Sequence, residues 1–72
     1  MSAQAEIKQQ LAACSSIAGN CKGNADYASY SFSQGDETNG RMYVAHLREN
    51  VARLEYALSR LDRLKKKAEV AS

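Results

Sequence analysis

The sequence predicts an α+β fold: a short N-terminal helix, a small β-hairpin and a long C-terminal helix, with the two helices antiparallel. Apolar residues recur at helical spacing near the start of the chain and again, more regularly, after residue 41. Between these stretches, residues 27–33 alternate with the period of a strand. The chain has 72 residues, and 12 of its hydrophobic residues are alanine, so we expect one small domain, 1–72, with a thin core.

The first helix is expected over residues 2–18. Ile7 and Leu11 are four residues apart, which places them on one helical face. Ser2 can accept a hydrogen bond from an amide of the first turn, as an N-cap does. The pair Gly19-Asn20 predicts the end of this helix, because glycine readily takes the left-handed conformation that closes a helix.

A β-hairpin is expected within residues 27–40. In its first strand, Tyr30 and Phe32 alternate with serines, so the aromatic rings would share the face that packs on a core. The turn-rich stretch that follows leaves two alternatives for the second strand, residues 36–38 or residues 41–44. One of them must pair, because a lone strand leaves its backbone groups unsatisfied.

The long helix is expected over residues 41–67, with a frayed tail at 68–72. It carries an apolar stripe that consists of Val44, Leu47, Val51, Leu54, Leu58 and Leu61. Spacings of three and four residues over nearly three heptads are typical of a helix that packs on another helix. The expected core of the domain consists of Ile7, Leu11, Tyr30, Phe32, Leu47, Val51, Leu54, Leu58 and Leu61.

The residues that usually carry chemistry are few and scattered. His46 is the only histidine, and it falls on the outer flank of the long helix. Asp36 and Glu37 are adjacent in a turn that offers no apolar pocket for acid–base work. We therefore expect no catalytic residue, no cofactor, no small-molecule substrate and no enzymatic activity.

Cys14 and Cys21 are the only cysteines of the chain. Zinc sites normally need four ligands, and His46 lies too far along the chain to help this pair complete one. We expect no metal site. Free thiols are the expected state, and a disulfide is the alternative left open.

The net charge of +2 is too small to predict nucleic-acid binding, but it is unevenly distributed. Residues 1–40 carry a charge of −2 and residues 41–72 a charge of +4. The basic half is interpreted first as a solvated helix face, then as a protein interface, and last as a nucleic-acid surface. The interface candidates are Arg53, Tyr56, Arg60 and Arg63.

The N-terminal residues lack the apolar stretch of a signal peptide. The longest apolar runs are far short of the roughly 20 residues that a membrane-spanning helix needs. We expect a soluble, cytoplasmic chain with no membrane partner.

The order of elements, together with a short motif, resembles the gpW-like family of phage head–tail joining proteins. The motif is Tyr30-Ser31-Phe32, followed by Gly35 in a turn and by Leu54-Glu55 in the long helix. Arg41 stands where the family has a basic residue, whereas residues 36–39 are acidic where the family is basic and apolar.

The resemblance implies two antiparallel helices packed on a β-hairpin, and a structural role without an active site. Copies of the chain would form a ring on the portal and join head to tail in a virion assembled in the host cytoplasm. Its partners would be further copies, portal proteins or tail proteins. Arg53, Tyr56 and Arg60 would lie in the ring contacts. The alternative is a small helical interaction or regulatory protein that dimerises through the Leu/Val stripe.

Overall fold

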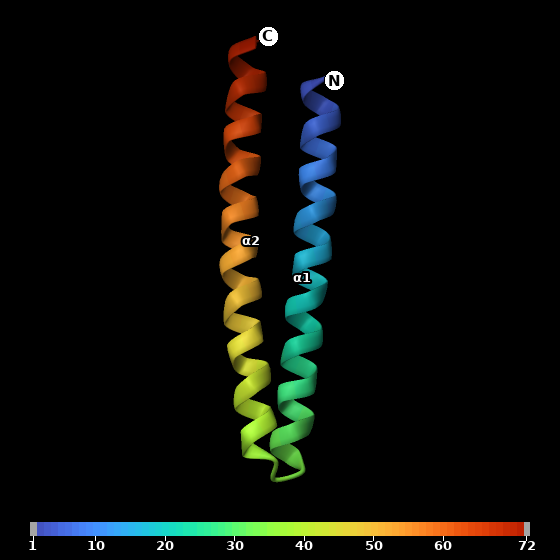
Figure 1. Ribbon diagram of the computed structural model, residues 1–72. Helices are drawn as coiled ribbons and strands as arrows, with labels where there is room; N and C mark the ends of the chain where they lie inside the picture. The colour runs from blue at the N-terminus through green and yellow to red at the C-terminus, as the bar shows by residue number, and fades with distance from the viewer. Residues whose placement is uncertain (1, 72) are drawn as a thin grey trace.

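The computed structural model describes residues 2–71, which form a helical hairpin. Helix α1 covers Ala3–Ser33 and helix α2 covers Glu37–Ala71, and the two lie antiparallel and side by side with both chain ends at the same end of the rod (Figure 1). The Cα atoms span 55 × 14 × 13 Å. No strand occurs within residues 2–71, so the predicted α+β fold and its β-hairpin are wrong.

The stretch that predicts a strand, residues 27–33, is the last part of α1. Ala28 and Ser31 are buried against α2 three residues apart, which is the spacing of a helix. Tyr30 and Phe32, expected in the core, are 65% and 46% exposed. The alternation of aromatic and small residues is confined to residues 27–33. The spacing of three and four residues between buried positions, in contrast, runs along all of α1 and ends at Ala28 and Ser31.

Gly19-Asn20 does not end the first helix, and α1 runs 15 residues beyond the predicted end at residue 18. A glycine inside a helix costs only about 1 kcal/mol relative to alanine. The seam with α2 continues past Gly19, from Ile17 to Cys21, and this packing offsets that cost. Within residues 2–71 the chain reverses only at residues 34–36. Of the two predicted second strands, 36–38 overlaps α2 and 41–44 lies inside it.

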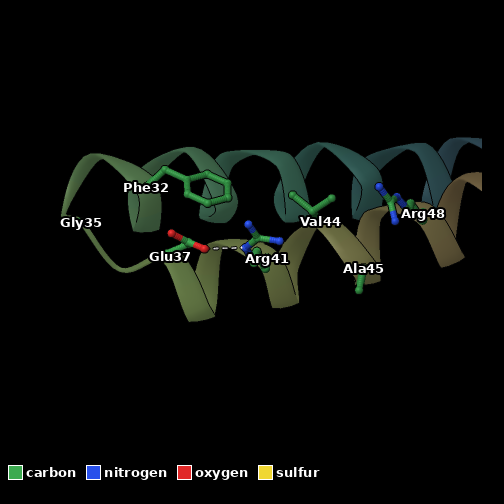
Figure 2. Close-up of a pocket in the computed structure, with 7 residues that line it drawn as sticks. All are labelled: Phe32, Gly35, Glu37, Arg41, Val44, Ala45 and Arg48. Carbon is green, nitrogen blue, oxygen red and sulfur yellow. Dashed lines mark hydrogen bonds and ion pairs between the residues drawn. The ribbon is translucent and has the colours of Figure 1, made fainter.

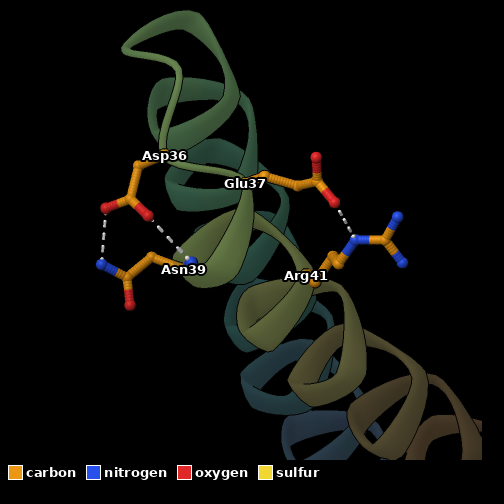
Figure 3. A network of polar contacts seen from close by, with 4 residues as sticks. All are labelled: Asp36, Glu37, Asn39 and Arg41. Carbon is orange, nitrogen blue, oxygen red and sulfur yellow. Dashed lines mark hydrogen bonds and ion pairs between the residues drawn. The ribbon is translucent and has the colours of Figure 1, made fainter.

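The turn combines the end of one helix with the start of the next. Gly35 has a φ of 75°, and its N–H donates to Phe32 O at 3.0 Å, while Asp36 N–H donates to Ser31 O at 2.9 Å. This pair of hydrogen bonds is a Schellman motif. Asp36 then caps α2, because its Oδ1 accepts from Asn39 N–H at 3.1 Å (Figure 3). At the other end of α1, Ser2 Oγ accepts from Ala5 N–H, which confirms the predicted N-cap.

The helices meet along a seam with a heptad spacing on both sides. On α1 the seam consists of Ala3, Ile7, Gln10, Cys14, Ile17, Cys21, Asn24, Ala28 and Ser31. On α2 it consists of Gly40, Tyr43, Leu47, Asn50, Leu54, Ala57, Leu61, Leu64 and Ala68. Each of these residues is buried or half-buried, and the alternating spacing of three and four residues matches a coiled-coil-like contact.

The predicted Leu/Val stripe divides between the seam and the surface. Leu47, Leu54 and Leu61 lie in the seam, whereas Val51 and Leu58 are 40% and 44% exposed. The second row of the seam on α2 falls one residue earlier than the stripe predicts, at positions 43, 50 and 57. The helix also continues to Ala71, where the sequence predicts a frayed tail.

Candidate interaction surfaces

The middle of one long side of the hairpin is apolar, and charged residues border it. It is formed by Leu11, Ala18, Ala25 and Phe32 of α1 and by Val44, Val51 and Leu58 of α2, and we call it the apolar side. Each of these residues directly follows a seam residue, so the two rows lie on the same side of an antiparallel pair. Leu11, predicted for the core, is 49% exposed here.

At the turn end, the apolar side opens into a hollow of about 660 Å³. Phe32 and Val44 reach into it from the two helices, and Arg41 and Arg48 border it (Figure 2). The Phe32 ring lies over buried Gly40, where a Cβ atom would stand 2.6 Å from the ring carbons Cδ1 and Cζ. The absence of a side chain at residue 40 therefore lets this ring lie across the two helices.

The predicted interface candidates gather on the opposite side of the seam. Arg53, Tyr56 and Arg60 line a hollow of about 510 Å³ together with Ala13 and Ile17 of α1. We call this surface, including Arg63 and Lys67 in an adjoining hollow, the basic side. Arg53 and Arg60 each directly precede a seam residue, whereas every residue of the apolar side directly follows one. The basic side and the apolar side therefore lie on opposite sides of the seam.

Acidic and aromatic residues near the turn have structural partners. Glu37 Oε2 accepts from Arg41 Nε at 2.7 Å, an exposed pair worth a few tenths of a kcal/mol (Figure 3). Tyr43 stacks on Tyr27 across the seam, with ring centroids 5.3 Å apart, and exposed His46 lies 6.5 Å from the Tyr43 ring.

Among residues 2–71, no group of three His, Cys, Asp or Glu side chains is arranged to hold a metal ion. Cys14 and Cys21 are free and half-buried. They occupy the same side of α1 seven residues apart, a rise of about 10.5 Å that is too long for a disulfide between them. A disulfide between these two cysteines, the alternative to free thiols, is therefore incompatible with α1.

Two polar contacts across the seam lie outside every prediction made from the sequence. Asn50 Nδ2 donates to Asn24 Oδ1 at 2.6 Å, and Gln10 Nε2 donates to the Ala57 carbonyl at 3.1 Å. A signal existed in the sequence, because Asn50 stands seven residues after Tyr43 and seven before Ala57. A pattern of large apolar residues alone does not include this row, because Asn50 is polar.

The fold and its surfaces define the class of protein: an antiparallel helical hairpin with a mixed polar and apolar seam. No family model, no curated protein and no solved structure matches the chain. Neither helix, over the residues described, has an apolar stretch long enough to cross a membrane.

Proposed function

We propose that this chain is a non-enzymatic assembly protein, which works by packing its apolar side against helices of another subunit. The observation that carries the proposal is the apolar side itself. Leu11 and Phe32 on α1 and Val51 and Leu58 on α2 are each 40–49% exposed along this one side. Contiguous exposed apolar surface rimmed by polar residues is typical of interaction sites.

The internal packing of the hairpin supports the same role. Among the side chains that the structure describes, the buried hydrophobic residues are Ala28, Ala57 and Leu61, and of these only Leu61 is large. The accessible surface is 5481 Å² for a mass of 7.9 kDa. A folded monomer of this mass typically exposes about 4,400 Å². The excess, about 1,100 Å², reflects the elongated rod of 55 × 14 × 13 Å, in which each helix is covered on one side alone.

A narrower form of the proposal places this assembly in a virion, at the junction of a phage head and tail. Its support is the helical part of the resemblance, Leu54-Glu55 on α2. The β-hairpin that the resemblance also implies does not occur within residues 2–71. A portal or terminase gene beside the gene for this chain would support the narrower role, and a neighbourhood without either gene would count against it.

The general proposal is tested by sedimentation of extracts from cells that make the chain at its native level. The parent chain is expected to sediment faster than a free 7.9 kDa hairpin, because its apolar side is occupied. The Val51→Asp variant is expected to sediment as the free hairpin, because a carboxylate would have to be buried in the contact.

Ser59→Asp is the matched control, since it adds the same charge at an exposed position of α2 outside the apolar side. It should sediment like the parent chain. Circular dichroism of each purified variant verifies that the helices are retained. A parent chain that sediments as the free hairpin would show that the proposal is wrong.

A further inference from the structure

We infer that the partner on the apolar side is a second copy of this chain, with α2 packed antiparallel on α2 of that copy. This inference rests on the proposed function, and it adds the identity, orientation and number of the partners. Such a contact uses the same surface on both copies and closes at two, so it gives a four-helix dimer rather than a ring.

Between residues 41 and 62, the charges that border the apolar side form a gradient along α2, whereas Glu37, which is paired with Arg41, and Lys65 lie beyond its two ends. Arg41 and Arg48 lie toward the turn, and Glu55 and Asp62 lie toward the open end, each seven residues from the next and each exposed. On the helix surface, Val51 has Arg48 and Glu55 as its i−3 and i+4 neighbours. These side chains therefore rim any helix that covers Val51.

In an antiparallel pair of α2 helices related by one two-fold axis, the basic residues of each copy face the acidic residues of the other. Arg48 would face Glu55 of the partner subunit, and Arg41 would face Asp62 of the partner subunit. Both pairs have the same midpoint in the sequence, between residues 51 and 52, so one axis near Val51 aligns both. By symmetry each pair occurs twice.

Two other arrangements fit the charges less well. In a parallel pair, each charged residue would face its own copy, which brings like charges together. If α2 instead covered α1 of the second copy, Asp62 would lie near Lys8 of the partner subunit, but Arg48 would lie near Lys22 of the partner subunit, which has the same charge. The register of the hairpin places these two residues at a similar height, because Asn24 is hydrogen-bonded to Asn50. The α2–α2 pairing is the arrangement that joins opposite charges in both pairs.

The length of the apolar side is consistent with a second hairpin as its partner. The apolar side runs along both helices, from Leu11 to Phe32 and from Val44 to Leu58, so a second hairpin of equal length covers it.

The test is the dissociation constant of the purified chain and of charge-reversed variants, measured by sedimentation equilibrium at low salt. The parent chain is expected to be a dimer of 7.9 kDa subunits. Arg48→Glu alone and Glu55→Arg alone should each weaken the dimer by about tenfold, because each replaces two opposite-charge pairs with like-charge pairs. The double variant Arg48→Glu/Glu55→Arg exchanges the charges and should return to within about twofold of the parent.

Arg53→Glu is the matched control, because it makes the same charge reversal on the opposite side of the seam. It should leave the dissociation constant unchanged. An unchanged or tighter dimer in Arg48→Glu would overturn the α2–α2 pairing, since a tighter dimer is what an α1–α2 contact near Lys22 predicts. A purified chain that stays monomeric while the chain in extracts sediments as an assembly would overturn the second-copy inference and leave the proposed function standing.

Discussion

Asn50 Nδ2 donates a hydrogen bond to Asn24 Oδ1 at 2.6 Å, which joins α1 and α2 across the seam, in the half nearer the turn. The two residues are 26 positions apart, and both are half-buried. This bond gives the Asn50 amide group an acceptor and the Asn24 carbonyl a donor, and unlike a contact between two apolar residues it is directional. A polar pair at a seam position typically fixes the register of two helices.

Replacement of one partner of this pair is therefore expected to cost stability. Asn24→Ala should lower the free energy of unfolding by about 1–2 kcal/mol relative to Asn20→Ala, because Asn50 is left half-buried without its acceptor. Asn20 is an exposed asparagine on the same helix, so it carries the same change in helix propensity. Urea unfolding followed by circular dichroism, at one protein concentration, measures the difference. Equal stabilities would contradict a structural role for the pair.

The double variant Asn24→Leu/Asn50→Leu separates stability from register. Apolar replacement of both partners should recover or exceed the parent stability, because neither polar group is left unpaired. The register is expected to become less well defined, with a broader set of backbone NMR signals near residues 24 and 50. Sharp, parent-like signals would show that packing alone sets the register.

How far the sequence predicts this fold depends on the element. The spacing of Leu47, Leu54 and Leu61 correctly predicts a helix that packs on another along this row, and Ser2 correctly predicts the start of α1. The strand at 27–33 is wrong because a period of two over seven residues is also compatible with a helix that buries only Ala28 and Ser31. The predicted helix end at Gly19 is wrong because packing against α2 stabilises α1 on both sides of this glycine.

The sequence predicts the basic side better than the apolar side. The sequence groups Arg53, Tyr56 and Arg60 by their spacing on one helix, and the structure brings them to one hollow. The apolar side was not predictable from α2 alone, since Val51 and Leu58 follow the same heptad rhythm as the seam. Only the position of α1 decides which residues of the Leu/Val stripe are covered.

The glycines of the two helices should respond differently to alanine. Gly19→Ala and Gly23→Ala are each expected to raise the free energy of unfolding by about 0.5–1 kcal/mol, because a Cβ at either site meets nothing within 4 Å. Gly40→Ala should not gain this amount, since its Cβ would displace the Phe32 ring. For a domain of this size, 1 kcal/mol corresponds to a shift in Tm of about 4–8 °C. A gain at Gly40 equal to that at Gly19 would contradict the position of the ring.

The turn should be sensitive at two neighbouring residues for different reasons. Gly35→Ala is expected to cost about 1–2 kcal/mol, because an L-residue with a side chain is strained at a φ of 75°. Asp36→Ala should cost about 1 kcal/mol through loss of the cap on Asn39 N–H, whereas Asp36→Asn keeps an acceptor and should lose less. Thermal unfolding measures each loss. Gln34→Ala is the control, since its side chain is exposed in the same turn.

The two cysteines are expected to be free, alkylatable thiols in the folded chain. Both lie half-buried in the seam, so alkylation should be slower in the native hairpin than in urea. Mass spectrometry of the intact, unreduced and alkylated chain should show two modified residues per chain. A chain that accepts no label in urea without reductant would contain a Cys14–Cys21 disulfide, which would contradict a continuous α1.

The basic side and the apolar side are expected to contribute to different properties, and a triple variant separates them. Arg53→Ala/Tyr56→Ala/Arg60→Ala should leave the free energy of unfolding within about 0.5 kcal/mol per site, because all three residues are exposed. It should also leave the dimer intact, since these residues face away from the apolar side. Leu58→Asp, on the apolar side of the same helix, should dissociate the dimer while the helices remain. Sedimentation equilibrium and circular dichroism compare the two variants. If the triple variant dissociates and Leu58→Asp does not, the copies meet over the basic side and the apolar side is not the dimer contact.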